Sequence, residues 1–315
     1  MLTLFAMPKP FRGHIGTIQR NAIGSWIRLH QACEVLLFGD EEGTAEVAKE
    51  FGLQHFPSVA RNEFGTPLLN DVFMKAEEAA RHSLVCYVNC DIILGNAFIR
   101  AVESVRRWRE RFLMVGECWN LDVTQPLAFD REQWAQELES LARLKGKSRG
   151  PHAIDYFVFP RGLYEEIPPF ALGRVYFDNW LVWKARAVGA DVVDATSVVT
   201  AIHQNHDYSH LKGGRQDTWK GEEGIRNIEL AGGRRHWYFI CDATHRLTSK
   251  GPKRRWGRYF RVRSRWEIAQ ARAKSIWIWW GNLFWRLADL TRPIRHPLGL
   301  RLTNFERFKS YLTRQ

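Results

Sequence analysis

The chain has 315 residues, 45% of them hydrophobic and 25% charged, which is the composition of an ordinary globular protein. A chain of this length holds one large α/β domain or two small ones. Its formal net charge of +12 is confined to one end. Residues 250–315 contain 17 Lys and Arg against 3 Asp and Glu, a net of +14, whereas residues 1–249 contain 29 against 31, a net of −2. This asymmetry predicts a nearly neutral body and a C-terminal extension that meets an anionic surface.

The cysteines argue against a protein built on disulfides. There are five, an odd number, and none forms a CxxC pair, so the sequence has neither a disulfide framework nor a zinc-binding spacing. A reducing compartment fits this pattern. The N-terminal MLTLFAMPKPF has no basic segment, and no stretch reaches the roughly 18 apolar residues that span a bilayer. The sequence therefore predicts a cytoplasmic location.

Strand-like apolar runs alternate with helical patterns in the first part of the chain. Strands are expected over residues 2–7, 34–38, 53–56 and 84–89, and helices over 15–29, 44–51 and 67–82. Such alternation is typical of an α/β fold in which a parallel sheet has helices on both faces. Ligands bind outside the carboxyl ends of the strands in these sheets. The sequence places Pro8, Asp40 and Asn89-Cys90-Asp91 at such ends.

The second part of the chain continues the alternation. Helices are expected over 96–111, 131–144 and 178–188, strands over 111–116, 154–159 and 191–200, and loops over 145–151 and 201–206. A boundary near residues 249–252 separates a domain of residues 1–249 from the basic extension of residues 250–315.

Asn89-Cys90-Asp91 is the first candidate for chemistry. A buried strand that ends in a carboxylate places that carboxylate at the edge of the sheet. Mg²⁺ and Mn²⁺ prefer oxygen ligands and complete their coordination with substrate phosphates. The alternative is that Asp91 only caps the following turn or helix.

Three histidines follow the last expected strand of the body. His203, His206 and His210 are spaced three and four residues apart, which on a helix would resemble a zinc site. Their polar neighbours favour a loop instead, from which His203 can complete the coordination of a phosphate-bound metal. A hydrogen-bonded structural His is the alternative at each position, and it is favoured for His206 and His210.

Two acidic residues are candidates for the catalytic base. Asp178 begins an expected helix, where a carboxylate usually acts as an N-cap. A helix start is also a rigid position, which suits a base that must be pre-oriented. A reaction in which a hydroxyl group attacks its substrate needs one carboxylate to take the proton of that hydroxyl. Asp178 is the first choice and Asp155, within an expected strand, is the second.

The chain resembles GT-A-fold glycosyltransferases, the nucleotide-diphospho-sugar transferase superfamily, and especially one group of bacterial proteins in it. The matching segments are MPKPF (7–11), QRNAIGSW (19–26), LFGDEEG (37–43), NEFGTPLLND (62–71), YVNCDI (87–92), IDYFVFPRG (154–162), DNWL (178–181) and AIHQNHDYSH (201–210). Together they cover about residues 2–210 in order. The resemblance implies a mixed, mainly parallel sheet flanked by helices.

The resemblance also implies a hexosyltransferase-type enzyme that uses a nucleotide diphosphate-sugar and Mn²⁺ or Mg²⁺. Asp91 matches the last Asp of the superfamily's Asp-x-Asp motif, and Asn89 stands at the first position, where it can hydrogen-bond the ribose but is a weaker metal ligand. His203 matches a late metal ligand, and Asp178 matches the late acidic base of inverting members. Residues that match the nucleotide pocket are Pro8, Arg20, Asp40, Asn62, Thr66 and Asn70.

The extension interleaves basic and aromatic residues. Residues 253–274 alternate Arg with Trp, Tyr and Phe, and Trp277, Trp280 and Phe284 recur at helical spacing. Such a helix suits an anionic membrane surface, which would make the protein peripheral and its acceptor a glycan or a lipid-linked molecule. The same pattern also fits packing on the body or, less well, nucleic-acid binding by phosphate contacts and stacking.

Two other functions stay open at this stage. One is a non-catalytic protein that binds nucleic acid or membrane through the extension. The other is a sugar-phosphate nucleotidyltransferase, although such enzymes usually carry a glycine-rich loop after the first strand, where this chain has MPKPFRGHIG.

Overall fold

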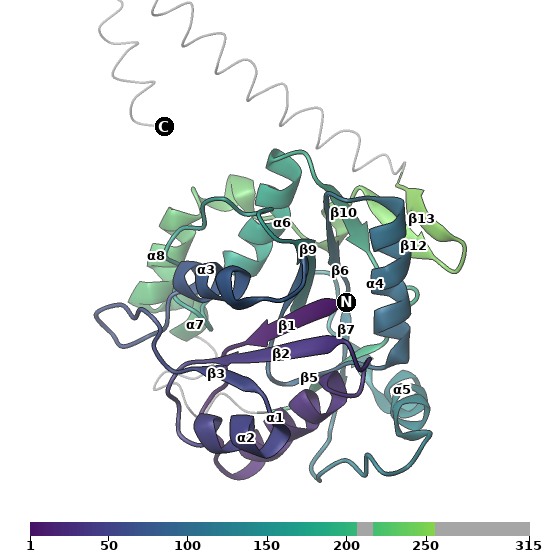
Figure 1. The fold of residues 1–315 in the computed structure, drawn as a ribbon. Coiled ribbons are helices and arrows are strands. Elements are labelled where there is room, and N and C mark those ends of the chain that lie inside the picture. Colours follow the sequence, from purple (N-terminus) through teal and green to yellow (C-terminus); the bar gives the residue numbers. More distant parts are fainter. Residues whose placement is uncertain (207–216, 256–315) are drawn as a thin grey trace, which may run out of the picture. The chain divides into compact units, whose positions relative to one another are not determined.

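The computed structural model describes residues 1–206 and 217–255 (Figure 1). Residues Met1–Arg255 form one compact unit, which we call the first unit. Most of the basic extension therefore lies outside the described residues, as do its expected helix, its expected membrane contact and His210. The expected boundary near residues 249–252 falls inside a β-hairpin of the first unit, because Gly251–Arg254 pairs with His245–Thr248.

A nine-stranded sheet forms the centre of the first unit (Figure 1). Its strands, in spatial order, are β13 (Gly251–Arg254), β12 (His245–Thr248), β10 (Asp191–Asp194), β6 (Phe112–Val115), β9 (Tyr156–Pro160), β4 (Leu84–Val88), β1 (Leu2–Ala6), β2 (Cys33–Phe38) and β3 (Gln54–Phe56). Seven of the nine run in one direction, and β9 and β13 run against their neighbours. The predicted mixed, mainly parallel α/β sheet is confirmed.

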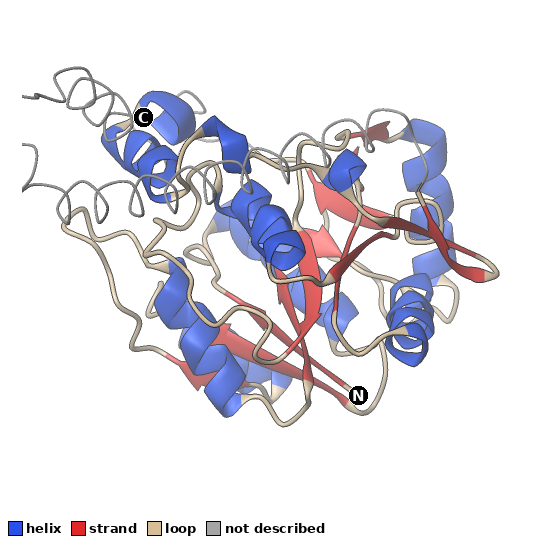
Figure 2. Ribbon diagram, turned by 90° about the horizontal axis from the view of Figure 1, so that it is seen from above, coloured by secondary structure: helices blue, strands red, loops and turns tan. Residues whose placement is uncertain are grey.

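Helices cover both faces of this sheet, because its strands are apolar on both sides (Figure 2). Alternate residues of β1 separate cleanly, since Leu2, Leu4 and Ala6 belong to one core and Phe5 to the other. The first core also includes α1 (Gly13–Trp26), α2 (Thr44–Phe51) and α4 (Asn96–Trp108). The second includes α3 (Leu69–Ala79) and α6 (Phe177–Ala187).

A smaller four-stranded sheet lies beside the first core. Its order is β5 (Ile92–Ile93), β11 (Ala201–Gln204), β7 (Cys118–Leu121) and β8 (Lys147–Ser148), and α5 (Trp134–Lys145) packs on it. The remaining described helices are α7 (Asp217–Lys220), α8 (Glu222–Leu230) and the 3₁₀ turns η2 (Arg234–His236) and η3 (Ile240–Asp242).

The small sheet corrects two sequence predictions. His203 was expected in a loop but lies on β11, because Ala201–Gln204 pairs with both β5 and β7. The basic segment after α5 was expected as a loop, but Lys147–Ser148 forms β8 against β7. Both segments are too short and too polar for their alternation to be visible in sequence.

Within the described part of the chain, no helix is both long enough and apolar enough to cross a membrane.

Candidate active site

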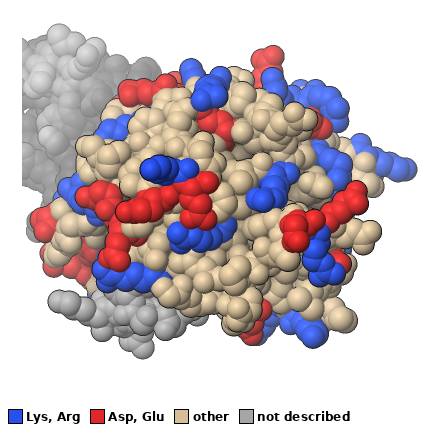
Figure 3. All heavy atoms as spheres, turned by 60° about the horizontal axis from the view of Figure 1, so that its bottom comes forward, with Lys and Arg blue, Asp and Glu red and all other residues tan. Residues whose placement is uncertain are grey.

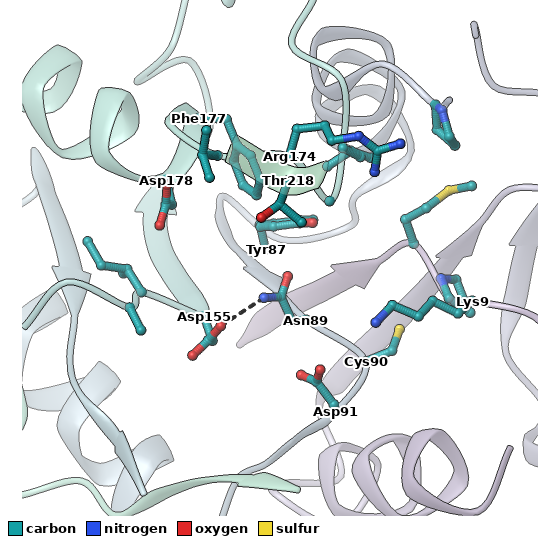
Figure 4. Close-up of a pocket in the computed structure, with 18 of the residues that line it drawn as sticks. Lys9, Tyr87, Asn89, Cys90, Asp91, Asp155, Arg174, Phe177, Asp178 and Thr218 are labelled. Atoms are coloured by element: carbon teal, nitrogen blue, oxygen red, sulfur yellow. Dashed lines mark hydrogen bonds between the residues drawn. The ribbon is translucent and has the colours of Figure 1, made fainter. Parts of the chain in front are cut away.

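A cavity of about 600 Å³ opens where the parallel strands end (Figure 4). Met7, Pro8 and Lys9 reach it directly after β1, and Asn89, Cys90 and Asp91 reach it directly after β4. Beneath the cavity, the Tyr87 ring packs 5.3 Å from Phe73 and 5.5 Å from Phe5 between ring centroids. The cavity therefore rests on a closely packed aromatic layer, which makes its floor rigid.

Asp155 reaches the same cavity because β9 is antiparallel to β4. The start of β9 lies beside the end of β4, and Val88 pairs with Tyr156. Asp155 was expected within a strand, but it lies one residue before β9. Its backbone carbonyl accepts a hydrogen bond from the Asn89 N–H at 3.0 Å, and its Oδ1 accepts one from the Asn89 side-chain amide at 3.0 Å. Figure 4 shows this side-chain pair at the centre of the cavity.

Arg149 supplies the positive charge next to Asp155. Its Nε lies 3.2 Å from Asp155 Oδ2, and both side chains are largely buried. The Arg149 backbone is fixed as well, because its N–H donates to the Cys118 carbonyl at 3.0 Å. No sequence pattern singles out Arg149, since it lies in the segment that was expected to be a basic loop.

Asp91 faces two imidazoles. Its Oδ2 accepts a hydrogen bond from His206 Nε2 at 3.0 Å and lies 3.6 Å from His203 Nε2. One ligand atom from each of these residues lies within 4.8 Å of the others. Burial by itself raises the pKa of Asp91, but His203, the hydrogen bond from His206 and Lys9 together hold the pKa well below its ordinary value. Asp91 is therefore a carboxylate at neutral pH.

The backbone around Asp91 is fixed by Gln204, which is fully buried. The Asp91 carbonyl accepts from the Gln204 backbone N–H at 3.1 Å and from its side-chain amide at 3.2 Å. The same amide donates to the Ile18 carbonyl in α1 at 2.7 Å. Because Gln204 joins β11, α1 and the turn after β4, the Asp91 backbone has a set position before any ligand binds.

The three side chains fit a divalent metal. Asp91 Oδ1 and His203 Nδ1 are buried and have no hydrogen-bond partner among residues 1–206 and 217–255. Buried polar atoms nearly always have a hydrogen-bond partner or a ligand. Two buried polar atoms without one in the same cluster are consistent with a bound metal ion. A carboxylate with neutral imidazoles is a familiar ligand set for divalent metals. Burial lowers the pKa of His203, although Asp91 and Asp155 oppose this, and the lowered value favours the neutral imidazole that binds metals.

Lys9 directs its side chain toward Asn89 and Asp91 (Figure 4). Gln19, in α1, forms hydrogen bonds with both the backbone N–H and the backbone carbonyl of Lys9. The Lys9 N–H donates to Gln19 Oε1 at 2.7 Å, and the Gln19 amide donates to the Lys9 carbonyl at 2.8 Å. Gln19 is 2% exposed, so the pair is shielded from competing water. The chain thus places a cation beside the predicted metal cluster.

Asp178 lies on the opposite wall, in the first turn of α6 (Figure 4). It was expected as the N-cap, but that position belongs to Tyr176, which has a left-handed backbone with φ of 81°. Burial, reinforced by the charge of Asp155, raises the pKa of Asp178 to about 7, against the opposing effect of hydrogen bonds from the helix start. A carboxyl group with this pKa can take up and release a proton near neutral pH.

The structure brings some of the predicted nucleotide-pocket residues to the cavity and leaves others outside. Pro8, Thr66, Asn89 and Asp91 line it. Asp40 does not, because its exposed carboxylate pairs with Arg61 at 2.5 Å, and the next residue, Glu41, lines the wall instead. The reason is Gly39, whose φ of 92° turns the chain after β2.

Three further predicted residues do not line the cavity. Arg20 pairs on the surface with Glu50 at 3.2 Å. Asn62 accepts the Thr66 N–H at 2.9 Å and donates to Glu223 at 2.7 Å, so it shapes the loop that carries Thr66. Asn70 lies in the first turn of α3.

The charges of the cavity wall are balanced. Lys9, Arg61, Arg149 and Arg174 line it together with Glu41, Asp91, Asp155 and Asp178. The outer surface carries both signs as well, and on the face in Figure 3 a run of acidic side chains has basic side chains above and below it. Ion pairs such as that of Arg12 with Glu42 bring opposite charges together on the surface. This face has no basic stripe of the kind that tracks a polyanion.

The sequence matches no protein-family profile and no curated protein. Similar solved structures include glucosyl-3-phosphoglycerate synthase from Mycobacterium tuberculosis in complex with Mg²⁺ and uridine-diphosphate. It has 15% identity and a TM-score of 0.46, and the match covers 74% of this chain and 80% of that chain. Another is S. aureus TarS 1–349 in complex with UDP-GlcNAc, with 10% identity, a TM-score of 0.48, and 73% and 65% of the two chains covered. Likeness at this level concerns the course of the backbone, so activity must be inferred from the side chains of the site.

Proposed function

We propose that this protein is a glycosyltransferase that moves a sugar from a nucleotide diphosphate-sugar to an acceptor hydroxyl. The observation that carries the proposal is one cavity with two chemically different walls (Figure 4). One wall gathers Asp91, His203, His206 and Lys9, which suit a diphosphate and its metal. The other presents Asp178, which suits a base. A transfer reaction needs both, separated by the space that the sugar occupies.

The metal cluster and Lys9 would hold the diphosphate. Asp91 and His203, with His206 beside them, would bind Mn²⁺ or Mg²⁺, and a metal bound there neutralises the charge that grows on the leaving diphosphate. Lys9 adds a fixed positive charge on the same side of the cavity. Asn89 gives its side-chain N–H to Asp155, so its carbonyl oxygen is the group left to accept a hydrogen bond from the donor.

Asp178 is the better candidate for the base, and Asp155 has a positioning role. Asp155 is held by the Asn89 amide at 3.0 Å and by Arg149 at 3.2 Å, two partners that fix its place. The raised pKa of Asp178 makes that carboxylate the more ready proton acceptor near neutral pH. Asp155 would therefore orient Asn89 and Arg149 while Asp178 takes the acceptor proton.

The nucleotidyltransferase alternative fits less well. A loop that cradles phosphates does so with free backbone N–H groups. Pro8 and Pro10 have no N–H. The N–H groups of Lys9, Phe11 and Arg12 donate to Gln19, to the Glu42 carbonyl and to the Pro10 carbonyl. Side chains and a metal would have to bind the phosphates here, which is the arrangement that the transferase proposal uses.

Calorimetry with nucleotides tests the proposal. The ligands are UDP, GDP, UDP-glucose and GDP-mannose, each with and without MnCl₂. Wild type should bind at least one of them in the presence of Mn²⁺, and Asp91→Ala should lower that affinity by about tenfold or more and remove its dependence on Mn²⁺. Asp130→Ala, at an exposed position, is the control and should match wild type. The proposal fails if wild type binds none of the four or if Asp91→Ala binds as tightly as wild type.

A further inference from the structure

An indole forms part of the cavity wall near the candidate base. Trp237 lines the cavity and is half-buried. Its ring stacks on that of Tyr176, with 5.0 Å between centroids and 28° between planes. We call Trp237 and Tyr176 the aromatic platform. An aromatic side chain that lines a polar cavity offers an apolar surface to a ligand with an apolar face.

Hydrogen bonds connect the aromatic platform to α6, the helix that carries Asp178. The Trp237 indole N–H donates to Asn179 Oδ1 at 2.6 Å, and the Asn179 amide donates to the Tyr238 carbonyl at 2.8 Å. Asn179 is 4% exposed and follows Asp178 directly. One turn of helix therefore sets the position of the carboxylate and of the indole together, so a ligand on the platform has a fixed relation to the base.

Tyr176 has a strained backbone conformation in the aromatic platform. Its φ of 81° is positive, and no other residue except glycine has a positive φ in the parts of the chain that the structure describes. Side chains other than glycine rarely adopt this region, and such strain clusters at functional sites. Here the strained residue is the N-cap of α6, and its ring stacks against that of Trp237.

The charges beside the platform favour a neutral ligand. Arg149 is offset by Asp155, 3.2 Å away, and Asp178 adds a further carboxyl group. Among the described residues on this side of the cavity, Arg149 pairs with Asp155 and Arg174 pairs with Glu223, so an anionic acceptor would meet carboxylates beside cations that already have partners. Carboxylates beside an aromatic ring suit a molecule with many hydroxyl groups and an apolar ring face, since carboxylates accept hydrogen bonds from hydroxyls.

We propose that the aromatic platform binds a neutral saccharide ring of the acceptor and presents one of its hydroxyls to Asp178. This inference rests on the proposed glycosyl transfer. The acceptor oxygen bonds to the anomeric carbon of the donor sugar. The bond from that carbon to the diphosphate oxygen breaks, and its electron pair leaves with the diphosphate. The hydroxyl proton passes to the Asp178 carboxylate.

The test measures acceptor use and donor binding separately. The donor is the nucleotide sugar that binds in calorimetry, and transfer is compared among methyl α-glucoside, methyl α-mannoside, methyl β-N-acetylglucosaminide, 3-phosphoglycerate and farnesyl phosphate. Wild type should use at least one methyl glycoside. Trp237→Ala should raise the KM for that glycoside by about fivefold to tenfold and leave the Kd for the donor nucleotide within about twofold. Trp237→Phe, which keeps a ring, should recover most of the loss.

Trp183→Ala is the matched control, because Trp183 stacks on His236 outside this cavity and should not affect glycoside KM. The inference is overturned if Trp237→Ala uses the glycoside as well as wild type does, or if wild type transfers only to 3-phosphoglycerate or farnesyl phosphate. The proposed glycosyl transfer stands in both cases. If wild type binds no nucleotide sugar at all, the proposed function itself fails.

Discussion

Asn89 and Asp155 are joined by two hydrogen bonds of 3.0 Å, one between their backbones and one between their side chains. The pair closes the ladder between β4 and β9 and places an amide where the superfamily resemblance expects a carboxylate. An Asp at position 89 would face the Asp155 carboxylate at hydrogen-bond distance. The Asn is therefore the residue that the neighbouring Asp155 requires.

Asn89→Asp should consequently harm the protein, although it restores the Asp-x-Asp pattern. Two carboxylates would replace a donor–acceptor pair, at a cost of about 1–3 kcal/mol in the free energy of unfolding at pH 8. Denaturant unfolding at pH 8 and pH 5 measures this, and the loss should shrink at pH 5 as one carboxylate takes up a proton. Asn89→Asp/Asp155→Asn should regain part of the stability. An Asn89→Asp variant as stable as wild type at pH 8 would contradict this account of the pair.

Asp178→Asn should abolish transfer while the donor nucleotide still binds. The amide cannot accept the acceptor proton as a base, and removal of a general base typically costs about 10²–10⁴-fold in rate. In wild type, kcat/KM should rise with pH through about 7, because only the ionised Asp178 is active and its pKa is about 7. Initial rates from pH 5 to pH 9 test this. A flat profile in that range would remove Asp178 as the base.

The Asp178 carboxyl group should make stability fall with rising pH, whereas it makes activity rise. Its pKa is raised on folding, so between about pH 4 and pH 7 the folded state binds more protons than the unfolded state, and stability falls as the pH rises. Asp178→Asn removes this penalty. We expect the variant to gain roughly 1–4 kcal/mol over wild type at pH 8 and little at pH 4. Thermal unfolding at both pH values checks the sign, and an equal effect at both would contradict it.

Lys9→Met should weaken diphosphate binding more than nucleoside binding. A charge-assisted contact to phosphate contributes about 1.5–3 kcal/mol, so the affinity for the nucleoside diphosphate should fall by about tenfold or more. The affinity for the nucleoside alone should change little, because the nucleoside has no phosphate for the Lys9 ammonium group to contact. Lys49→Met, at an exposed position in α2, serves as the comparison. Equal losses for nucleoside and diphosphate would show that Lys9 acts on something other than the phosphates.

The imidazoles should make the metal site favour Mn²⁺ over Mg²⁺. Mg²⁺ prefers oxygen ligands, and nitrogen ligands at two of three positions count against it. Titration of Mn²⁺ followed by electron paramagnetic resonance should give a Kd that rises by about 10–100-fold in His203→Ala, with a smaller rise in His206→Ala. His30→Ala, an exposed His, should leave the Kd unchanged. Tighter binding of Mg²⁺ than Mn²⁺ by wild type would contradict the ligand set.

Part of the site could be predicted because it depends on local pattern. The apolar run of β4 ends at Val88, and the next three residues reach the cavity, as expected. Asp178 was placed at the start of a helix from its sequence neighbours, and α6 begins at Phe177. The choice between Asp40 and Glu41 could not be made in this way, because a single glycine turn decides which carboxylate faces inward.

The sequence by itself determined the succession of strands and helices and put Asp91 at a strand end, since period-2 and period-3.6 patterns are local properties of the chain. Only the tertiary structure decided that β9 runs against β4, which brings Asp155 and Arg149 to Asn89. It also decided that His203 lies on a strand beside Asp91. The contacts of Asn89 with Asp155 and of Asp91 with His203 and His206 join residues 66–115 positions apart in the chain. Their formation depends on strand direction and on packing between elements, which no local pattern encodes.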